Sequence, residues 1–241
     1  MIPYKRLKFQ DYFTICSGNW NGLLTNLKMP QYRAIKFRHG KHKHTVNYQV
    51  RYDEDRNCIQ CIFQQTADKS DWKSNFEFPH KIYDKFTYDN ELIQLKCHRG
   101  WGDQWLSCQT SFRTDFAAQL ADHPDAFVEV FGWSLGSGMA QLAAEDIYFK
   151  FGIKSYLYTF GSVKPFFGRK TINFVRKCCV EAYNFYDHND IVGYMVPLPG
   201  WRAINHIKVE FDRFSISRLF NPKKYHTKYD TLETYPLATT Y

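Results

Sequence analysis

A serine between two glycines is the residue of this sequence whose type and spacing best suit chemistry. Ser134 stands between Gly132 and Gly136, after the apolar run 127–131 and before residues 135–150, where apolar side chains recur at helical spacing. The pattern predicts a strand, a sharp turn and a helix. So tight a turn needs minimal side chains two positions before and after its centre, which leaves the Ser134 hydroxyl above the sheet. Ser134 is therefore the candidate nucleophile, although glycine and serine also occur at ordinary strand-to-helix turns.

A serine nucleophile needs an imidazole to take its proton and a carboxylate to orient that imidazole. In sheets of this kind the partners follow the serine in the order Asp, His, which leaves few candidates. We favour His226 as the base, because it lies in a polar loop past the last predicted strand. His206 is the alternative, although its predicted strand turns it toward solvent. Either histidine could also be a plain surface residue.

The candidate acid is Asp190, which follows the predicted strand 180–185 by a few residues. Asp187, three residues earlier, is the alternative, and either carboxylate could simply cap a loop. The oxyanion formed on attack needs at least two donors, worth about 3 kcal/mol each. One would be the backbone N–H of Leu135, and the other Thr66, just after the predicted strand 57–63.

The surrounding elements must bring these residues to one edge of a sheet. Alternating apolar residues predict a hairpin of strands 45–52 and 57–63, whereas residues 1–44 show weak periodicity and are expected to form a helical or irregular cover. The remaining predicted elements are strand 92–97, helix 103–122, strand 127–131, a helix to about 150, strand 155–159, helix 170–179 and strand 180–185. Strands separated by helices predict an α/β fold with a mostly parallel sheet.

Composition bounds the class of protein. With 241 residues and 44% hydrophobic residues, the chain can bury one large core, so we expect one domain. Its seven cysteines cannot all pair, and neither an apolar run of 18 residues nor a signal-like start is present, so we expect a cytoplasmic protein. Cys58 and Cys61 lack a second pair at metal spacing, and cations flank the histidines at 39, 42 and 44, so neither group predicts a metal site.

The positive charge is concentrated in one segment. Of a net charge of +8, residues 1–45 hold nine basic residues and one acidic residue, Asp11. Such a segment could contact an anionic membrane surface or nucleic acid phosphates. A solvated face is the simpler interpretation, and we consider nucleic acid binding unlikely.

Several segments together resemble the class 3 lipase family, the fungal-lipase-like branch of the α/β-hydrolases. The similar segments, in chain order, are Ile62-Phe-Gln-Gln-Thr66, Asp71-Trp72 with Asn75, Cys97-His-Arg-Gly-Trp101, Gly132-Trp-Ser-Leu-Gly-Ser-Gly-Met-Ala140, Tyr158-Thr-Phe-Gly-Ser162 with Pro165, Asn189-Asp190-Ile-Val, Leu198-Pro-Gly-Trp201, and His226 with Tyr229. They span residues 46–229 in the order of the family. The resemblance implies one α/β-hydrolase domain over 46–241, with residues 1–45 as its basic N-terminal cover.

By the same resemblance, Ser134, Asp190 and His226 form the catalytic triad, and Thr66 with Leu135 forms the oxyanion hole. The family's lid falls on residues 77–91. The substrate-binding candidates are Phe78, Tyr83 and Trp133.

The sequence also departs from the family pattern. Trp133 replaces the elbow histidine, Gln64 and Gln65 replace Arg-Gly, and Gly193 replaces a proline. The interval from Asp190 to His226 is shorter than the family pattern predicts.

The functional expectation is a serine hydrolase that cleaves carboxylic (acyl) esters, with lipids as the expected substrates, through an acyl-enzyme intermediate and without metal or cofactor. The alternative is a catalytically silent lipase-like module that binds anionic lipid or protein, which the departures above would favour.

Overall fold

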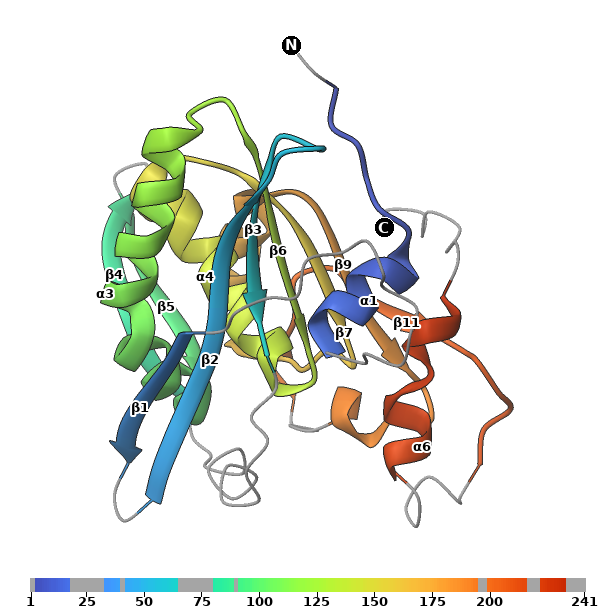
Figure 1. The fold of residues 1–241 in the computed structure, drawn as a ribbon. Helices are drawn as coiled ribbons and strands as arrows, with labels where there is room; N and C mark the ends of the chain where they lie inside the picture. Colours follow the sequence, from blue (N-terminus) through green and yellow to red (C-terminus); the bar gives the residue numbers. More distant parts are fainter. Residues whose placement is uncertain are drawn as a thin grey trace.

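A seven-stranded sheet forms the centre of the molecule (Figure 1). The structure, a computed structural model, describes residues 3–17, 33–39, 42–64, 80–88, 91–194, 199–215 and 222–232. Across the sheet the strands are β1 (Arg33–His39), β2 (His42–Asp53), β3 (Cys58–Phe63), β6 (Phe127–Trp133), β7 (Ser155–Phe160), β9 (Cys179–Asp187) and β11 (His206–Val209). The strands from β3 to β11 are parallel, and β2 and β1 are added antiparallel at one edge. The predicted α/β fold with a mostly parallel sheet is confirmed.

A second, antiparallel sheet lies beside the first. Its strand order is β10 (Trp201–Arg202), β8 (Phe166–Phe167), β5 (Glu91–His98) and β4 (His80–Tyr88). Strand β5 runs directly into helix α3, so the second sheet is connected to a helix that covers the central sheet.

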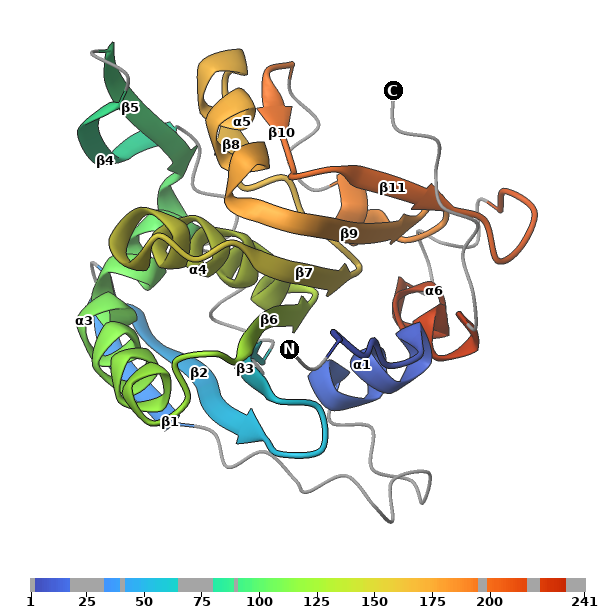
Figure 2. The ribbon, with the colours of Figure 1, turned by 90° about the horizontal axis from the view of Figure 1, so that it is seen from above.

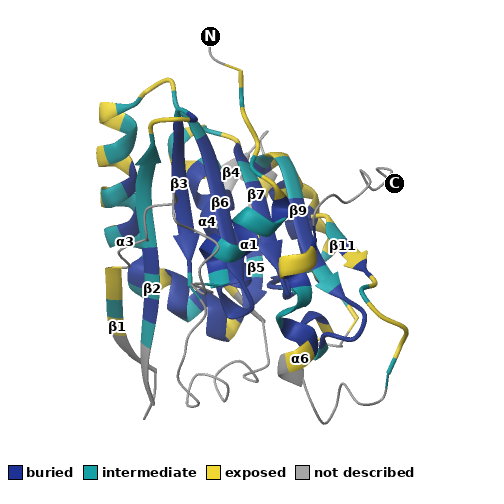
Figure 3. Cartoon of the chain, turned by 45° about the vertical axis from the view of Figure 1, so that its right-hand side comes forward, coloured by how far each residue is buried: buried dark blue, intermediate teal, exposed yellow. Residues whose placement is uncertain are grey.

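Helices cover both faces of the central sheet, as the view from above shows (Figure 2). The helices α3 (Arg99–Asp122) and α4 (Leu135–Phe151) lie on one face, and α1 (Phe9–Ser17) and α6 (Pro222–His226) lie on the other. A short helix α5 (Arg169–Val175) and the 3₁₀ turns Arg176–Cys178, Ile191–Tyr194 and Lys228–Thr231 complete the connections. In α3 the residues at steps of three and four, Trp105, Cys108, Phe112 and Phe116, are fully buried, as the spacing predicts. The central strands are mostly buried, whereas the outer helix α3 has buried and exposed residues (Figure 3).

A buried carboxylate in the middle of β6 fastens the N-terminal segment to the sheet. Oε1 of Glu129 accepts hydrogen bonds from the hydroxyls of Tyr4, at 2.7 Å, and Tyr12 and from the guanidinium of Arg56, while Oε2 accepts one from Gln60 at 3.2 Å. Glu129 is fully buried, so these donors offset the cost of removing its charge from water.

One part of the N-terminal region differs from the expected helical or irregular cover. Residues 33–39 form the edge strand β1, because β2 continues past residue 45 to His42 and turns back as a hairpin. Part of the basic charge is also paired within the protein. Arg6 forms an ion pair with Glu181, and Arg33 forms one with Asp115.

The cysteines and the helices are informative about the chemistry of the interior. None of the seven cysteines forms a disulfide, and six of them are buried. Burial raises the pKa of Cys108 to about 12, so this thiol is not a nucleophile near neutral pH.

Within the part of the chain that the structure describes, no helix has the length and apolar character needed to span a bilayer.

Candidate active site

The connection from β6 to α4 is a sharp turn centred on Ser134. Ser134 has φ of 58° and ψ of −126°, a conformation that costs strain in a residue with a Cβ. The two glycines are required by close approach. A Cβ on Gly132 would lie 2.4 Å from the carbonyl oxygen of Gly136, and a Cβ on Gly136 would lie 2.4 Å from that of Phe63. The turn therefore holds Ser134 at the N-terminus of α4, as the sequence predicts.

Hydrogen bonds fix the Ser134 backbone to the loop that follows β7. The N–H of Ser134 donates to the carbonyl oxygen of Phe160 at 2.9 Å, and the hydroxyl of Ser137 donates to the carbonyl oxygen of Ser134. The N–H of Val163 donates to that Ser137 hydroxyl at 3.0 Å. These hydrogen bonds join the turn to residues 160–163.

An aspartate and a histidine form a buried pair at the same end of the sheet. Nδ1 of His226 lies 2.7 Å from Oδ2 of Asp190, and both side chains are buried. A proton on Nδ1 that donates to the carboxylate leaves Nε2 as the basic nitrogen. Nε2 is buried and has no hydrogen-bond partner among the described residues. The arrangement leaves that nitrogen able to accept a proton.

Two further donors hold the Asp190 carboxylate. The N–H of Val192 donates to Oδ1 at 3.0 Å, and the hydroxyl of Tyr229 donates to Oδ2 at 2.9 Å. The Tyr229 hydroxyl in turn accepts the N–H of Asp187 at 2.7 Å. Burial, and after it the neighbouring Asp190 carboxylate, raises the pKa of Tyr229 well above 10, so its phenol keeps its proton. Both oxygens of the Asp190 carboxylate therefore have hydrogen-bond partners: Val192 at Oδ1, and Tyr229 and His226 at Oδ2.

The His226 ring lies against two residues: Trp133, which precedes Ser134, and Gly161, which follows Phe160. The indole of Trp133 stacks on the imidazole, with ring centroids 5.0 Å apart and an interplanar angle of 24°. Gly161, next to Phe160 in the chain, approaches the ring so closely that a Cβ there would lie 2.5 Å from Cε1 of His226. Ser134 follows Trp133 in the chain, and its N–H donates to Phe160, which precedes Gly161. Ser134 is therefore attached to the two segments that contact the imidazole.

The alternative residues lie in other surroundings. Nε2 of His206 lies 3.1 Å from the carbonyl oxygen of Ser162, and its ring stacks on Tyr186. Burial lowers the pKa of His206 to about 3. The expectation that His206 is turned toward solvent is wrong, because its ring is stacked and partly buried. The carboxylate of Asp187 lies 3.2 Å from Nδ1 of His188 and not in the His226 pair.

The predicted lid and oxyanion residues have different outcomes. Thr66 and Phe78 lie outside the described residues, whereas Leu135 is the first residue of α4. Of the predicted lid over residues 77–91, residues 80–88 form β4 and pair with β5. Tyr83 is buried there, 9% exposed, and its hydroxyl donates to Glu145 of α4 at 3.2 Å. The lid and the substrate contact of Tyr83 stay predictions.

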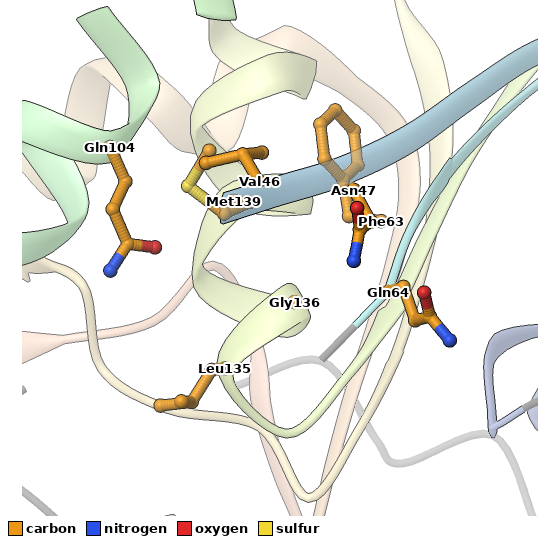
Figure 4. Close-up of a pocket in the computed structure, with 8 residues that line it drawn as sticks. All are labelled: Val46, Asn47, Phe63, Gln64, Gln104, Leu135, Gly136 and Met139. Carbon is orange, nitrogen blue, oxygen red and sulfur yellow. The ribbon is translucent and has the colours of Figure 1, made fainter. Parts of the chain in front are cut away.

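A small pocket opens beside the serine turn (Figure 4). Its cavity volume is about 10 Å³, close to the space that one water molecule needs. The described residues that line it come from β2, β3, α3 and the start of α4, and are Val46, Asn47, Phe63, Gln64, Gln104, Leu135, Gly136 and Met139. Leu135 and Gly136 belong to the turn itself, so the pocket adjoins the serine. Among the described residues, no group of three or more potential metal-binding side chains is present.

Two residues that the sequence analysis named only as parts of family-like segments make contacts in the site that it did not predict. Tyr229 is recognisable only as the tyrosine three residues after His226, and the spacing gives no indication that its hydroxyl reaches Asp190. Gly161 has φ of 54°, but a glycine after a strand gives no sign that its Cα abuts an imidazole.

Comparisons with known proteins agree with this architecture. A family model described as Lipase (class 3) matches residues 61–199, which is more than half of the chain. A search of curated proteins finds no match.

Solved structures of lipases share the fold. A mutant of MDLA from Penicillium cyclopium has a TM-score of 0.60 at 17% identity, over 75% of this chain and 64% of its own. The mono- and diacylglycerol lipase of Aspergillus oryzae has a TM-score of 0.58 at 20% identity, over 75% and 64%. A triacylglycerol lipase whose catalytic centre is described as a serine protease triad has a TM-score of 0.57 at 21% identity, over 75% and 67%.

The match is partial in length, since this chain spans about 64% of MDLA and about 64% of the Aspergillus oryzae lipase. At these identities the structures establish the α/β-hydrolase fold, and the family match covers the strand that leads to the serine turn, the turn itself and the Asp190 loop. The chain therefore belongs to the class 3 lipase family.

Proposed function

We propose that this protein is a serine hydrolase that cleaves carboxylic esters through an acyl-enzyme intermediate. The observation that carries the proposal is the buried Asp190–His226 hydrogen bond. Nε2 of His226 has no partner among the described residues, and its ring lies against Trp133, which precedes Ser134, and against Gly161. Membership of the class 3 lipase family supports the same chemistry.

In the proposed reaction the Ser134 hydroxyl attacks the ester carbonyl carbon. Nε2 of His226 takes the hydroxyl proton as the new carbon–oxygen bond forms, and Asp190 holds the ring and stabilises the imidazolium. The imidazolium then donates that proton to the departing alcohol, leaving Ser134 acylated. A water molecule then attacks the carbonyl carbon of the acylated Ser134, and His226 takes its proton. His226 returns that proton to the Ser134 oxygen as the carboxylic acid is released.

The negative oxygen of each tetrahedral intermediate requires donors. The N–H of Leu135 lies at the N-terminus of α4, where the unpaired amides and the helix dipole favour negative charge. Thr66 is proposed as the second donor on the basis of the family resemblance. Each such donor contributes about 3 kcal/mol to transition-state stabilisation.

We further propose that the substrates are lipid esters. The similar structures include lipases described as acting on mono-, di- and triacylglycerols. The apolar side chains of Val46, Phe63 and Met139 line the pocket beside Leu135, whose cavity of about 10 Å³ is smaller than an acyl group as it stands.

A serine-directed probe tests the proposal. A fluorophosphonate reporter should label the folded protein at Ser134, which peptide mapping would identify, and Ser134→Ala should lose both the label and the hydrolysis of short p-nitrophenyl esters. A folded wild-type protein that neither takes the label nor hydrolyses any of these esters would instead support a binding module. Full activity of Ser134→Ala would exclude the mechanism.

A further inference from the structure

Trp133 contacts His226 in two ways with one side chain. Its indole faces the imidazole, with centroids 5.0 Å apart and an interplanar angle of 24°. Its Nε1–H also donates a hydrogen bond, at 3.1 Å, to the backbone carbonyl oxygen of His226. The first contact restrains the tilt of the ring, and the second restrains the backbone from which the ring projects.

The indole is itself held in place from behind. Trp133 is 7% exposed, and Phe13 of α1 meets it edge-on with centroids 5.6 Å apart. The same Phe13 ring packs against Tyr229, whose hydroxyl donates to Asp190. One side chain of α1 thus supports the residue that contacts His226 and the residue that contacts Asp190.

We propose that Trp133 is a positioning residue for His226, acting through the stacked indole and the Nε1–H hydrogen bond. The inference rests on the proposed hydrolase function, in which His226 accepts the Ser134 proton. At that moment the imidazole becomes a cation, and the electron-rich face of an indole attracts a cation more than a neutral ring. The interaction is therefore stronger in the transition state than in the ground state, so its loss should lower kcat more than it changes KM.

Three substitutions separate the two contacts. Trp133→Phe keeps an aromatic face and removes the N–H donor, Trp133→Leu removes both, and Trp133→His restores a ring with a donor. The matched control is Trp201→Leu, because Trp201 is also buried, at 3% exposed, and its indole packs against His98 and Phe167 in the second sheet.

The kinetic expectation is a graded loss of kcat with KM little changed. From one lost hydrogen bond, Trp133→Phe should lose about 3- to 10-fold. Trp133→Leu, lacking the stacking as well, should lose about 10- to 100-fold, with Trp133→His between Trp133→Leu and wild type. Trp201→Leu should keep the wild-type kcat.

A spectroscopic measurement without substrate completes the test. The proton between Asp190 and His226 gives a low-field ¹H NMR resonance, which should weaken or broaden in Trp133→Leu and persist in Trp201→Leu. If Trp133→Leu fails to fold, Trp133→Phe and Trp133→His decide the question by the same two measurements.

The proposal is overturned if the folded Trp133 variants keep the wild-type kcat and resonance, or if Trp201→Leu loses as much of both. Failure of the proposed function looks different. In that case the wild-type protein takes no fluorophosphonate, while the resonance still reports whether Trp133 orders the Asp190–His226 pair.

Discussion

The hydroxyl of Tyr229 lies 2.9 Å from Oδ2 of Asp190, the same oxygen that lies 2.7 Å from Nδ1 of His226. One carboxylate oxygen therefore has two hydrogen-bond partners. The phenol of Tyr229 keeps its proton, because burial and then the Asp190 carboxylate raise its pKa. The geometry makes Tyr229 an orienting group for the acid.

Tyr229→Phe should lower kcat about 10- to 150-fold with little change in KM, because a hydrogen bond to a charged group contributes about 1.5–3 kcal/mol. Steady-state kinetics on a short ester measures both constants. The matched control is Tyr48→Phe, which removes a phenol that donates to Asp115 at 2.8 Å. A Tyr229→Phe protein with kcat within twofold of wild type would show that the hydroxyl does not orient Asp190.

Gly161→Ala should strongly reduce kcat. The new Cβ would lie 2.5 Å from Cε1 of His226 and 3.1 Å from Oδ2 of Asp190, so the pair must separate, and we expect a loss of about 100-fold or more. Gly152→Ala is the control, because Gly152 has a φ of 72° and nothing lies within 4 Å of its added Cβ. Both variants incur backbone strain, but only Gly161→Ala should lose activity. Equal kcat values for the two would contradict the contact.

His206 should make the protein less stable as the pH falls. Burial lowers its pKa from 6.5 to about 3, so between these values the unfolded chain binds a proton that the folded chain does not. Stability therefore decreases as the pH is lowered through this window, by at most about 1.4 kcal/mol per pH unit for this one group. In His206→Gln the fall in Tm between pH 7 and pH 4.5 should be smaller than in wild type. Parallel Tm curves for the two proteins over that interval would rule this out.

Glu129 should be essential for stability, because its removal leaves the Arg56 guanidinium buried without its main partner. We expect Glu129→Leu to cost about 3–5 kcal/mol, measured by urea denaturation, and the double variant with Arg56→Met to recover most of that loss. Arg33→Ala, which breaks the exposed pair with Asp115, should leave the urea midpoint unchanged. A Glu129→Leu protein as stable as wild type would show that the buried pair is not needed.

Local patterns in the sequence are sufficient to predict the central sheet and the serine turn. The apolar run before Ser134 and the glycines around it depend on neighbours in the chain, and so do the helical steps from Trp105 to Phe116. The same holds for the general position of Asp190, which follows a strand. These features were predicted because the residues that determine them lie within a few positions of one another.

The contacts that link distant segments could not be predicted in this way. Residues 80–88 have the aromatic and charged composition of an exposed loop, but pairing with β5 makes them a strand and buries Tyr83. For Trp133 the sequence predicts a contact with substrate, but it gives no sign that the indole lies against a histidine 93 positions away in the chain. The sequence alone contains no signal for such a distance.

The Glu129 cluster also constrains the order in which the protein assembles. Tyr4 must meet Glu129 and Tyr158, which are 125 and 154 positions further along the chain. During synthesis the first helix is therefore made long before the strands that receive it, and it must remain undocked until β6 and β7 have emerged. Because contacts so far apart close late and slowly, we expect the N-terminal segment to dock as one of the final steps of folding.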